Sequence, residues 1–120
     1  MQENCLFCKI IAGQVPGKVV YQDDDIFAFE DIHPQAPQHI LIIPRQHIMA
    51  SMNDLTPEQA PLLMKIFQAA QRIAAERGID KTGYRFVTNV GPDSQQSVFH
   101  IHFHLLGGAP MGVFGIPYKG

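Results

Sequence analysis

Three histidines alternate with large apolar residues in the segment 99–106. His100, His102 and His104 make up half of the six histidines in the chain. An imidazole titrates near neutral pH and can act as a nucleophile, a proton carrier or a metal ligand. The row is therefore compatible with a nucleophilic site, a tri-histidine metal site or a mixture of the two.

Strict alternation is typical of a half-buried β-strand, in which successive side chains point to opposite faces of a sheet. It predicts the histidines on one face and a set of apolar residues on the other, namely Phe99, Ile101, Phe103 and Leu105. Three imidazoles on a buried face need partners, because an unpaired buried polar group is costly. We therefore expect the row to be a functional site.

Cys5 and Cys8 form a C-x-x-C pair, which is a redox pair, half of a zinc site or a coincidence. A thioredoxin-type redox pair accompanies a βαβ unit, and no βαβ pattern follows here. A closed Cys₂His₂ zinc site needs two further ligands, for which His47 and His100 are candidates. Such a site is structural, and its affinity for the metal would stabilise a small domain.

The elements that carry these residues follow from apolar spacing and turn residues. We expect a short helix over 6–12, and a long helix that begins at Thr56 and Pro57 and ends near Gly78. Pro61 either kinks the first turn of the long helix or marks its true start. The expected strands are 18–21, 26–30, 39–43, 84–89 and the histidine segment.

This order of elements favours an α+β fold, a five-stranded antiparallel sheet with one long and one short helix. The histidine strand comes last, and we expect its outer edge to be available for pairing with another chain. The length of 120 residues suits a single domain over 1–120.

Composition and charge exclude several classes of function. The formal net charge is −2 and the nine Lys and Arg are scattered, which gives no electrostatic footprint for a nucleic-acid polymer. No stretch approaches the roughly 18 apolar residues of a membrane helix. The first residues lack the pattern of a signal peptide, so we expect a cytoplasmic protein whose cysteines are free thiols or metal ligands.

The sequence resembles the histidine triad family, whose motif is His-φ-His-φ-His-φ-φ with φ apolar. Residues 100–106, His-Ile-His-Phe-His-Leu-Leu, match it at every position. Related residues recur at 5–11, 31–37, 39–44, 96–98 and Asn89. Leu-Gly-Gly at 106–108 is similar to the nucleotide-binding, phosphoramidase-type branch, and the C-x-x-C pair is similar to the zinc-bearing subgroup.

The resemblance implies a hydrolase that cleaves purine nucleoside 5'-phosphoramidates, or related AMP or GMP conjugates, at the α-phosphorus. It implies His102 as the nucleophile that forms a nucleotidyl-histidine, with His104 and Ser97 as the other catalytic residues. The implied nucleotide-binding residues are Leu6, Phe7, Ile10, Phe29, Asp31, Ile32, Asn89, Gln95, Gln96, Ser97, His102 and His104. Of these, Asp31 would receive the ribose hydroxyls, and the first four would line the purine pocket.

Further implications concern support, metal and assembly. His39 would support the triad indirectly, and the backbone at 95–96 would approach the phosphate, although the family is usually glycine-rich there. A structural Zn²⁺ would be bound by Cys5, Cys8, His47 and His100, and no catalytic metal is expected. The chain would form a homodimer with one larger continuous sheet, at whose interface the tail 111–120 shapes substrate preference. The alternatives are a tri-histidine zinc-dependent hydrolase and a non-enzymatic nucleotide sensor or scaffold.

Overall fold

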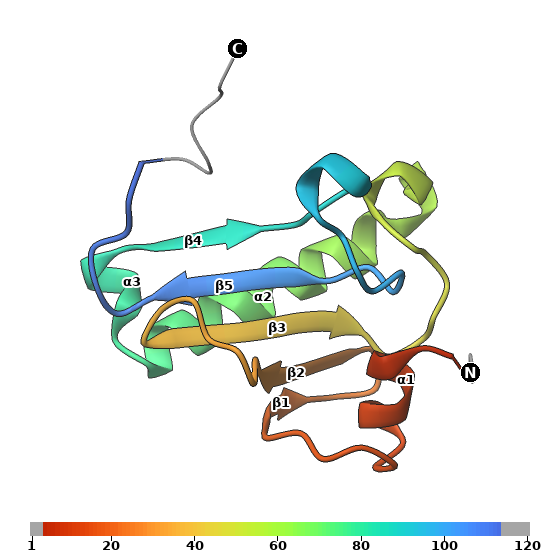
Figure 1. Ribbon diagram of the computed structural model, residues 1–120, viewed down its shortest axis with the longest axis horizontal. Coiled ribbons are helices and arrows are strands. Elements are labelled where there is room, and N and C mark those ends of the chain that lie inside the picture. Colours follow the sequence, from red (N-terminus) through yellow and green to blue (C-terminus); the bar gives the residue numbers. More distant parts are fainter. Residues whose placement is uncertain (1–3, 114–120) are drawn as a thin grey trace.

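Five strands form one antiparallel sheet in the order β1-β2-β3-β5-β4 in the computed structural model, which describes residues 4–113 (Figure 1). The strands are β1 (Val19–Gln22), β2 (Ile26–Glu30), β3 (Gln38–Pro44), β4 (Tyr84–Val87) and β5 (Phe103–Gly107). The helices are α1 (Leu6–Ile11), α2 (Ala60–Glu76) and α3 (Ile79–Thr82). Short 3₁₀ turns lie at Met52–Asp54, Pro57–Gln59 and Pro92–Ser94. The predicted α+β fold is confirmed, with α3 and the 3₁₀ turns in addition.

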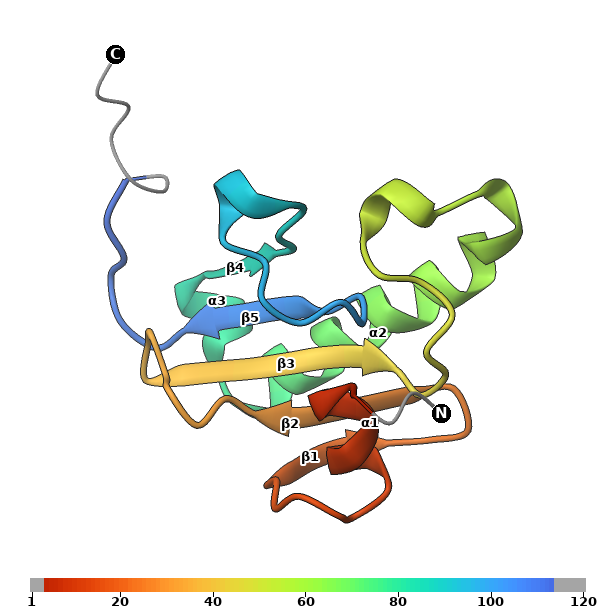
Figure 2. The same ribbon diagram turned by 45° about the vertical axis from the view of Figure 1, so that its right-hand side comes forward.

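The sheet separates two hydrophobic clusters, because alternate residues of each strand point to opposite faces. One face packs on α2 and includes Ile26, Ala28, Ile40, Ile42, Ile101, Phe103 and Leu105. The other face packs on α1 and includes Phe27, Phe29, Leu41 and Ile43. Figure 2 shows α2 behind the sheet and α1 in front of it. The alternation of the histidine segment therefore sends its apolar residues to the α2 side, as predicted, with Phe99 as the exception.

The histidine strand differs from its prediction in length and in position. β5 begins only at Phe103, so His100 and His102 lie in the segment that precedes it, and Phe99 is 59% exposed. β5 also lies between β3 and β4, so the expected free edge of the histidine strand was wrong. β5 contains one Phe and two Leu in five residues, whereas β4 begins with Tyr and Arg, so the more apolar strand occupies the interior of the sheet, where its residues are buried or half-buried.

The long helix begins with a capped 3₁₀ turn. The Thr56 hydroxyl accepts the backbone N–H of Glu58, and the Gln59 side chain accepts the backbone N–H of Thr56 at 2.7 Å. Pro61 lies in the first turn of α2, where a missing N–H costs nothing. It therefore marks the start of the α-helix and does not kink it.

Other predicted boundaries shift by one or two residues. α1 ends at Ile11, and β4 ends at Val87 where 89 was expected. The predicted domain 1–120 includes residues 1–3 and 114–120, which lie outside the described residues. The tail 111–120 lies outside them from residue 114 onward. Within 4–113 no helix has the length and apolar character needed to cross a membrane.

Candidate active site

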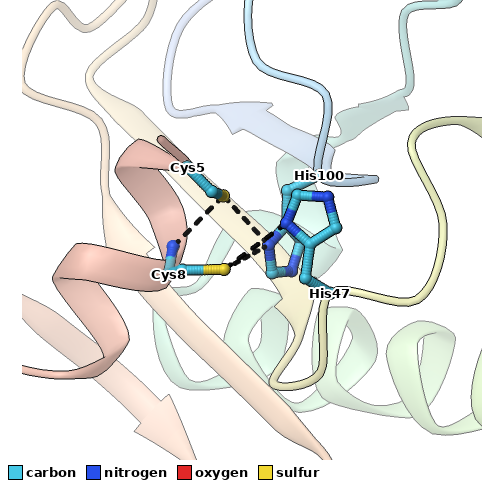
Figure 3. A group of neighbouring side chains, drawn as sticks. All are labelled: Cys5, Cys8, His47 and His100. Atoms are coloured by element: carbon cyan, nitrogen blue, oxygen red, sulfur yellow. Dashed lines mark hydrogen bonds between the residues drawn. The ribbon is translucent and has the colours of Figure 1, made fainter. Parts of the chain in front are cut away.

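Two cysteines and two histidines meet where three distant segments come together (Figure 3). Cys5 and Cys8 come from the start of α1, His47 from the loop after β3, and His100 from the segment before β5. Their ligand atoms all lie within 4.8 Å of one another. Cys5 caps α1, and its Sγ accepts the backbone N–H of Cys8 at 3.3 Å. The first turn of the helix thus orients both thiols.

The distances in this cluster fit a tetrahedral metal ion. The Sγ–Nδ1 distances are 3.4 Å for Cys5–His100, 3.4 Å for Cys8–His47 and 3.6 Å for Cys8–His100. Ordinary Zn–S and Zn–N bonds in a tetrahedron separate the two ligand atoms by about 3.6 Å. The Nε2–H of His100 donates to the Pro44 carbonyl at 2.8 Å, which leaves the lone pair on Nδ1, facing both thiols. The predicted ligands therefore lie together and could hold a metal ion.

A pocket of about 470 Å³ lies between α1, the loop after β2 and the triad. It is lined by most of the residues predicted to bind nucleotide, namely Leu6, Phe7, Ile10, Phe29, Asp31, Ile32, Ser97, His102 and His104, and also by His39. The Phe7 ring stands edge-on to Phe29 and to His102, with ring centroids 5.4 and 5.0 Å apart. Phe7 therefore connects the apolar wall of the pocket to the triad.

Three of the predicted nucleotide-binding residues, Asn89, Gln95 and Gln96, are not among the described residues that line this pocket. The Gln96 side chain is engaged by the backbone: Nε2 donates to the carbonyls of Ala50 at 2.8 Å and Val98 at 3.1 Å. Its Oε1 accepts the N–H of Gly91 at 3.0 Å. Gln95 has a left-handed φ of 64°, a conformation that glycine adopts most easily. The Gln96 side chain thus shapes the loop before Ser97.

His102 is held as a neutral ring with a free lone pair. Its Nδ1–H donates to the carbonyl of His100 at 2.9 Å, which leaves the lone pair on Nε2. Burial lowers the pKa of His102, although the bond to that carbonyl opposes the shift. The Thr88 hydroxyl donates to the carbonyl of His102 at 2.7 Å and fixes the backbone on the other side. His102 therefore has the form that a nucleophile needs at neutral pH.

His104 is held in the opposite tautomer. The backbone N–H of Gln35 donates to Nδ1 of His39 at 3.0 Å, so a neutral His39 carries its hydrogen on Nε2. That Nε2–H donates to Nδ1 of His104 at 2.9 Å, which places the hydrogen of a neutral His104 on its own Nε2. This atom is buried without a partner among the described residues. Burial lowers the pKa of His104 to about 4 and also lowers the pKa of His39, where nearby Asp31 opposes the shift.

A tri-histidine metal site does not fit this arrangement. The two groups of possible ligands within 4–113 are the cysteine cluster and the set Asp31, His39 and His104, so neither contains two triad histidines. In the second group, Nε2 of His39 carries a hydrogen as long as Nδ1 accepts the N–H of Gln35. The second group is therefore a chain of hydrogen bonds in this structure.

Several partners of the site were missed by the sequence-based prediction. The carbonyl of Pro44 and the backbone N–H of Gln35 set the tautomers of His100 and His39. Thr88 supports His102 from the residue after β4. Backbone partners leave no mark on residue types, and the role of Thr88 depends on which strands are neighbours. These contacts become visible only once the order of the strands in the sheet is known.

Comparison with known proteins agrees with the geometry. Residues 4–115 match the family model described as scavenger mRNA decapping enzyme C-term binding. The chain is 46% identical over 112 residues to the purine nucleoside phosphoramidase of Escherichia coli K12, covering 93% of each protein. A HIT family hydrolase structure from Legionella pneumophila Philadelphia 1 superposes with a TM-score of 0.88 at 48% identity, over 92% of this chain and 98% of that one.

A histidine triad protein from Clostridium difficile superposes with a TM-score of 0.90 at 37% identity, over 96% of this chain and 99% of that one. These matches span nearly the whole length of each relative. The chain belongs to the histidine triad family.

Proposed function

We propose that this protein is a hydrolase for purine nucleoside 5'-phosphoramidates that works through a covalent nucleotidyl-histidine. The observation that carries the proposal is the pair of opposite tautomers in one pocket. His102 offers a lone pair on its Nε2, whereas His104 offers a hydrogen on its own Nε2. The similarity to a purine nucleoside phosphoramidase supports the same reaction.

The chemistry follows from these two rings. Nε2 of His102 attacks the α-phosphorus, and the bond from phosphorus to the amine nitrogen breaks as that nitrogen takes a proton from solvent and leaves as the amine; the water that attacks in the second step returns a proton to solvent. Water then attacks phosphorus, the bond to Nε2 breaks, and the nucleoside monophosphate departs. Negative charge grows on the phosphoryl oxygens during both steps, and donors such as His104 Nε2–H and the Ser97 hydroxyl stabilise it by about 3 kcal/mol each.

The remaining pocket residues bind the nucleotide. The purine of an AMP or GMP conjugate lies against the apolar wall of Leu6, Phe7, Ile10 and Phe29, with Ile32 at the pocket edge. Asp31 accepts the ribose hydroxyls. The backbone at 95–96 and the Asn89 side chain approach the phosphate from the chain between β4 and Ser97.

In this proposal the cysteine cluster binds a metal ion that stabilises the fold and takes no part in the reaction. Zn²⁺ bound by Cys5, Cys8, His47 and His100 would tie α1 to the loop after β3 and to the segment before β5. A closed set of four protein ligands leaves no position for water, so the ion would supply stability to the fold. Two buried free cysteines also suit the reducing cytoplasm, where we place the protein.

We further propose a homodimer with one continuous sheet across two copies. In the described sheet β4 is an edge strand, and Tyr84 on it and Phe67 on α2 are 37% and 43% exposed. An unpaired edge beside apolar side chains is a site for strand addition. Sedimentation at micromolar concentration should give twice the chain mass, and a monomer would contradict the proposal.

Replacement of His102 tests the function directly. With adenosine 5'-phosphoramidate as substrate, the wild-type protein should release AMP, and denaturation in alkali, in which a phosphorus–nitrogen bond to histidine survives, should trap a protein heavier by one AMP moiety. His102→Ala should lose turnover and the adduct while still binding AMP. Full activity of His102→Ala would overturn the mechanism. Tight AMP binding by a wild-type protein without turnover would favour a nucleotide sensor.

A further inference from the structure

His39 has one hydrogen to donate and two acceptors within reach. Nδ1 of His104 lies 2.9 Å from Nε2 of His39, and Oδ2 of Asp31 lies 3.4 Å from the same atom. The other ring nitrogen already accepts the backbone N–H of Gln35 at 3.0 Å, so His39 cannot gain a second hydrogen without losing that bond. Its side chain is only 3% exposed, which keeps water from supplying a substitute donor. The hydrogen is thus donated to His104, while the nearby Asp31 carboxylate attracts it electrostatically.

The strength of the hydrogen bond from His39 to His104 sets how strongly the Nε2–H of His104 can donate a hydrogen bond. A ring that accepts a strong hydrogen bond at one nitrogen becomes a stronger donor at the other, because neighbouring hydrogen bonds polarise each other. His104 accepts at Nδ1 and holds its unpaired hydrogen on Nε2. Any pull of Asp31 on the His39 hydrogen weakens the bond to Nδ1 and, with it, the donor at Nε2.

Asp31 faces the pocket with part of its carboxylate uncommitted. Oδ1 accepts the backbone N–H of His33 at 2.8 Å, and the backbone N–H of Asp31 donates to the carbonyl of His39 at 3.0 Å. These bonds fix the carboxylate at the end of β2, while 19% of the side chain stays exposed. Hydroxyl donors that bind there would share the negative charge of the carboxylate and reduce its pull on the His39 hydrogen.

We propose that the ribose hydroxyls of the bound nucleotide act through Asp31 and His39 to make the Nε2–H of His104 a stronger hydrogen-bond donor. They would then raise the rate of the chemical step as well as the affinity for the nucleotide. This inference rests on the proposed function, since it assigns Asp31 to the ribose. His39 is a positioning residue in this scheme, because it acts on the substrate only through His104. The enzyme would then favour ribonucleotides over deoxyribonucleotides in turnover.

Single-turnover kinetics with two substrates test the proposal. Adenosine 5'-phosphoramidate and its 2',3'-dideoxy analogue should both bind, the analogue more weakly. The wild-type rate of the chemical step should be about tenfold lower for the analogue, which corresponds to one charge-assisted hydrogen bond. Equal single-turnover rates, with a difference confined to binding, would overturn the inference.

Variants of His39 separate positioning from a merely structural role. The amide of His39→Gln carries two hydrogens and can satisfy both acceptors, so the rate ratio between the substrates should fall to near one while the affinity ratio remains. His39→Phe donates nothing and should be slow with both substrates. Persistence of the wild-type rate ratio in His39→Gln would contradict the proposal.

Asp31→Asn provides a second route if His39→Gln fails to fold, as judged by its melting temperature. The amide has no charge to draw on the His39 hydrogen, so the rate ratio should again approach one, although ribose affinity falls. An unchanged rate ratio would overturn the coupling. Failure of the wild-type protein to cleave the ribonucleotide, or full activity of His102→Ala, would instead overturn the proposed function itself.

Discussion

The carbonyl of His100 accepts the Nδ1–H of His102 at 2.9 Å, while the ring of His100 faces the thiols of Cys5 and Cys8. One residue thus belongs to both sites. Its ring lies in the cysteine cluster, and its backbone sets the tautomer of the proposed nucleophile. A change in the cluster that moves His100 therefore changes how His102 presents its lone pair.

Removal of the proposed Zn²⁺ should therefore reduce stability and turnover together. Cys8→Ser is the sharpest change, because Cys8 contacts both histidines of the cluster. We expect loss of bound zinc and a loss of about 4 kcal/mol of unfolding free energy when free metal stands at roughly a thousand times its Kd. Elemental analysis and chemical unfolding measure the two effects.

The control for this prediction is the wild-type protein treated with a chelator and then reloaded with Zn²⁺. Chelation should reproduce the lower melting temperature and the lower kcat, and reloading should restore both. Cys8→Ser protein that keeps its zinc and its full kcat would contradict the assignment of the cluster.

Thr88 should matter for catalysis although it does not line the pocket. Its hydroxyl donates to the carbonyl of His102 at 2.7 Å. Thr88→Val keeps the shape but leaves that carbonyl without its donor, which costs about 1 kcal/mol of stability and should lower kcat more than it raises KM. Thr88→Ser keeps the hydroxyl and is the matched control. Equal kcat values for the two variants would show that this bond does not position His102.

The face that the residues from His100 onward occupy could be predicted from sequence, and the strand order could not. Alternation with period two depends only on local backbone geometry, so it correctly predicts that Ile101, Phe103 and Leu105 share one face of the sheet. The insertion of β5 between β3 and β4 depends on pairing between distant segments, which no local pattern encodes. The same holds for Phe99, whose exposure follows from where pairing stops.

The candidate site also contains residues that the sequence predicts and contacts that it does not. Residue types and spacing pointed to the cysteine cluster and to His102 and His104, because these side chains carry chemistry of their own. The tautomers of the rings depend on the backbone groups of Pro44 and Gln35, which have no signature in the sequence. Gln96 was predicted for its backbone, yet the structure shows its side chain bridging three backbone groups.

Acid should destabilise the protein through His104. Burial lowers the pKa of His104 to about 4, whereas an unfolded histidine titrates near its ordinary pKa of about 6.5. Between these values the unfolded chain binds a proton that the native ring does not, so the unfolding free energy falls as pH drops from about 6.5 to about 4. The limit is about 1.4 kcal/mol per pH unit, and screening lowers it because the ring is partly exposed.

Urea unfolding at several pH values between 7 and 4.5 tests this expectation. His104→Asn removes the titrating group, so its unfolding free energy should fall less steeply with acidification than that of the wild type. Taking the difference between the two proteins at each pH cancels the contribution of the cysteine cluster. Parallel curves for the two proteins would refute the role of His104.

Gln96 should control phosphate binding through the loop that it holds. Its amide donates to the carbonyls of Ala50 and Val98 and accepts from the N–H of Gly91, which fixes the chain just before Ser97. Gln96→Glu keeps the size and the acceptor but loses both donors, leaving two carbonyls facing a carboxylate. We expect a loss of about 2 kcal/mol of stability, a higher KM for adenosine 5'-phosphoramidate and unchanged zinc content. Gln96→Ala should also raise KM but without the charge repulsion, so a KM equal to that of the wild type in both variants would exclude this loop from substrate binding.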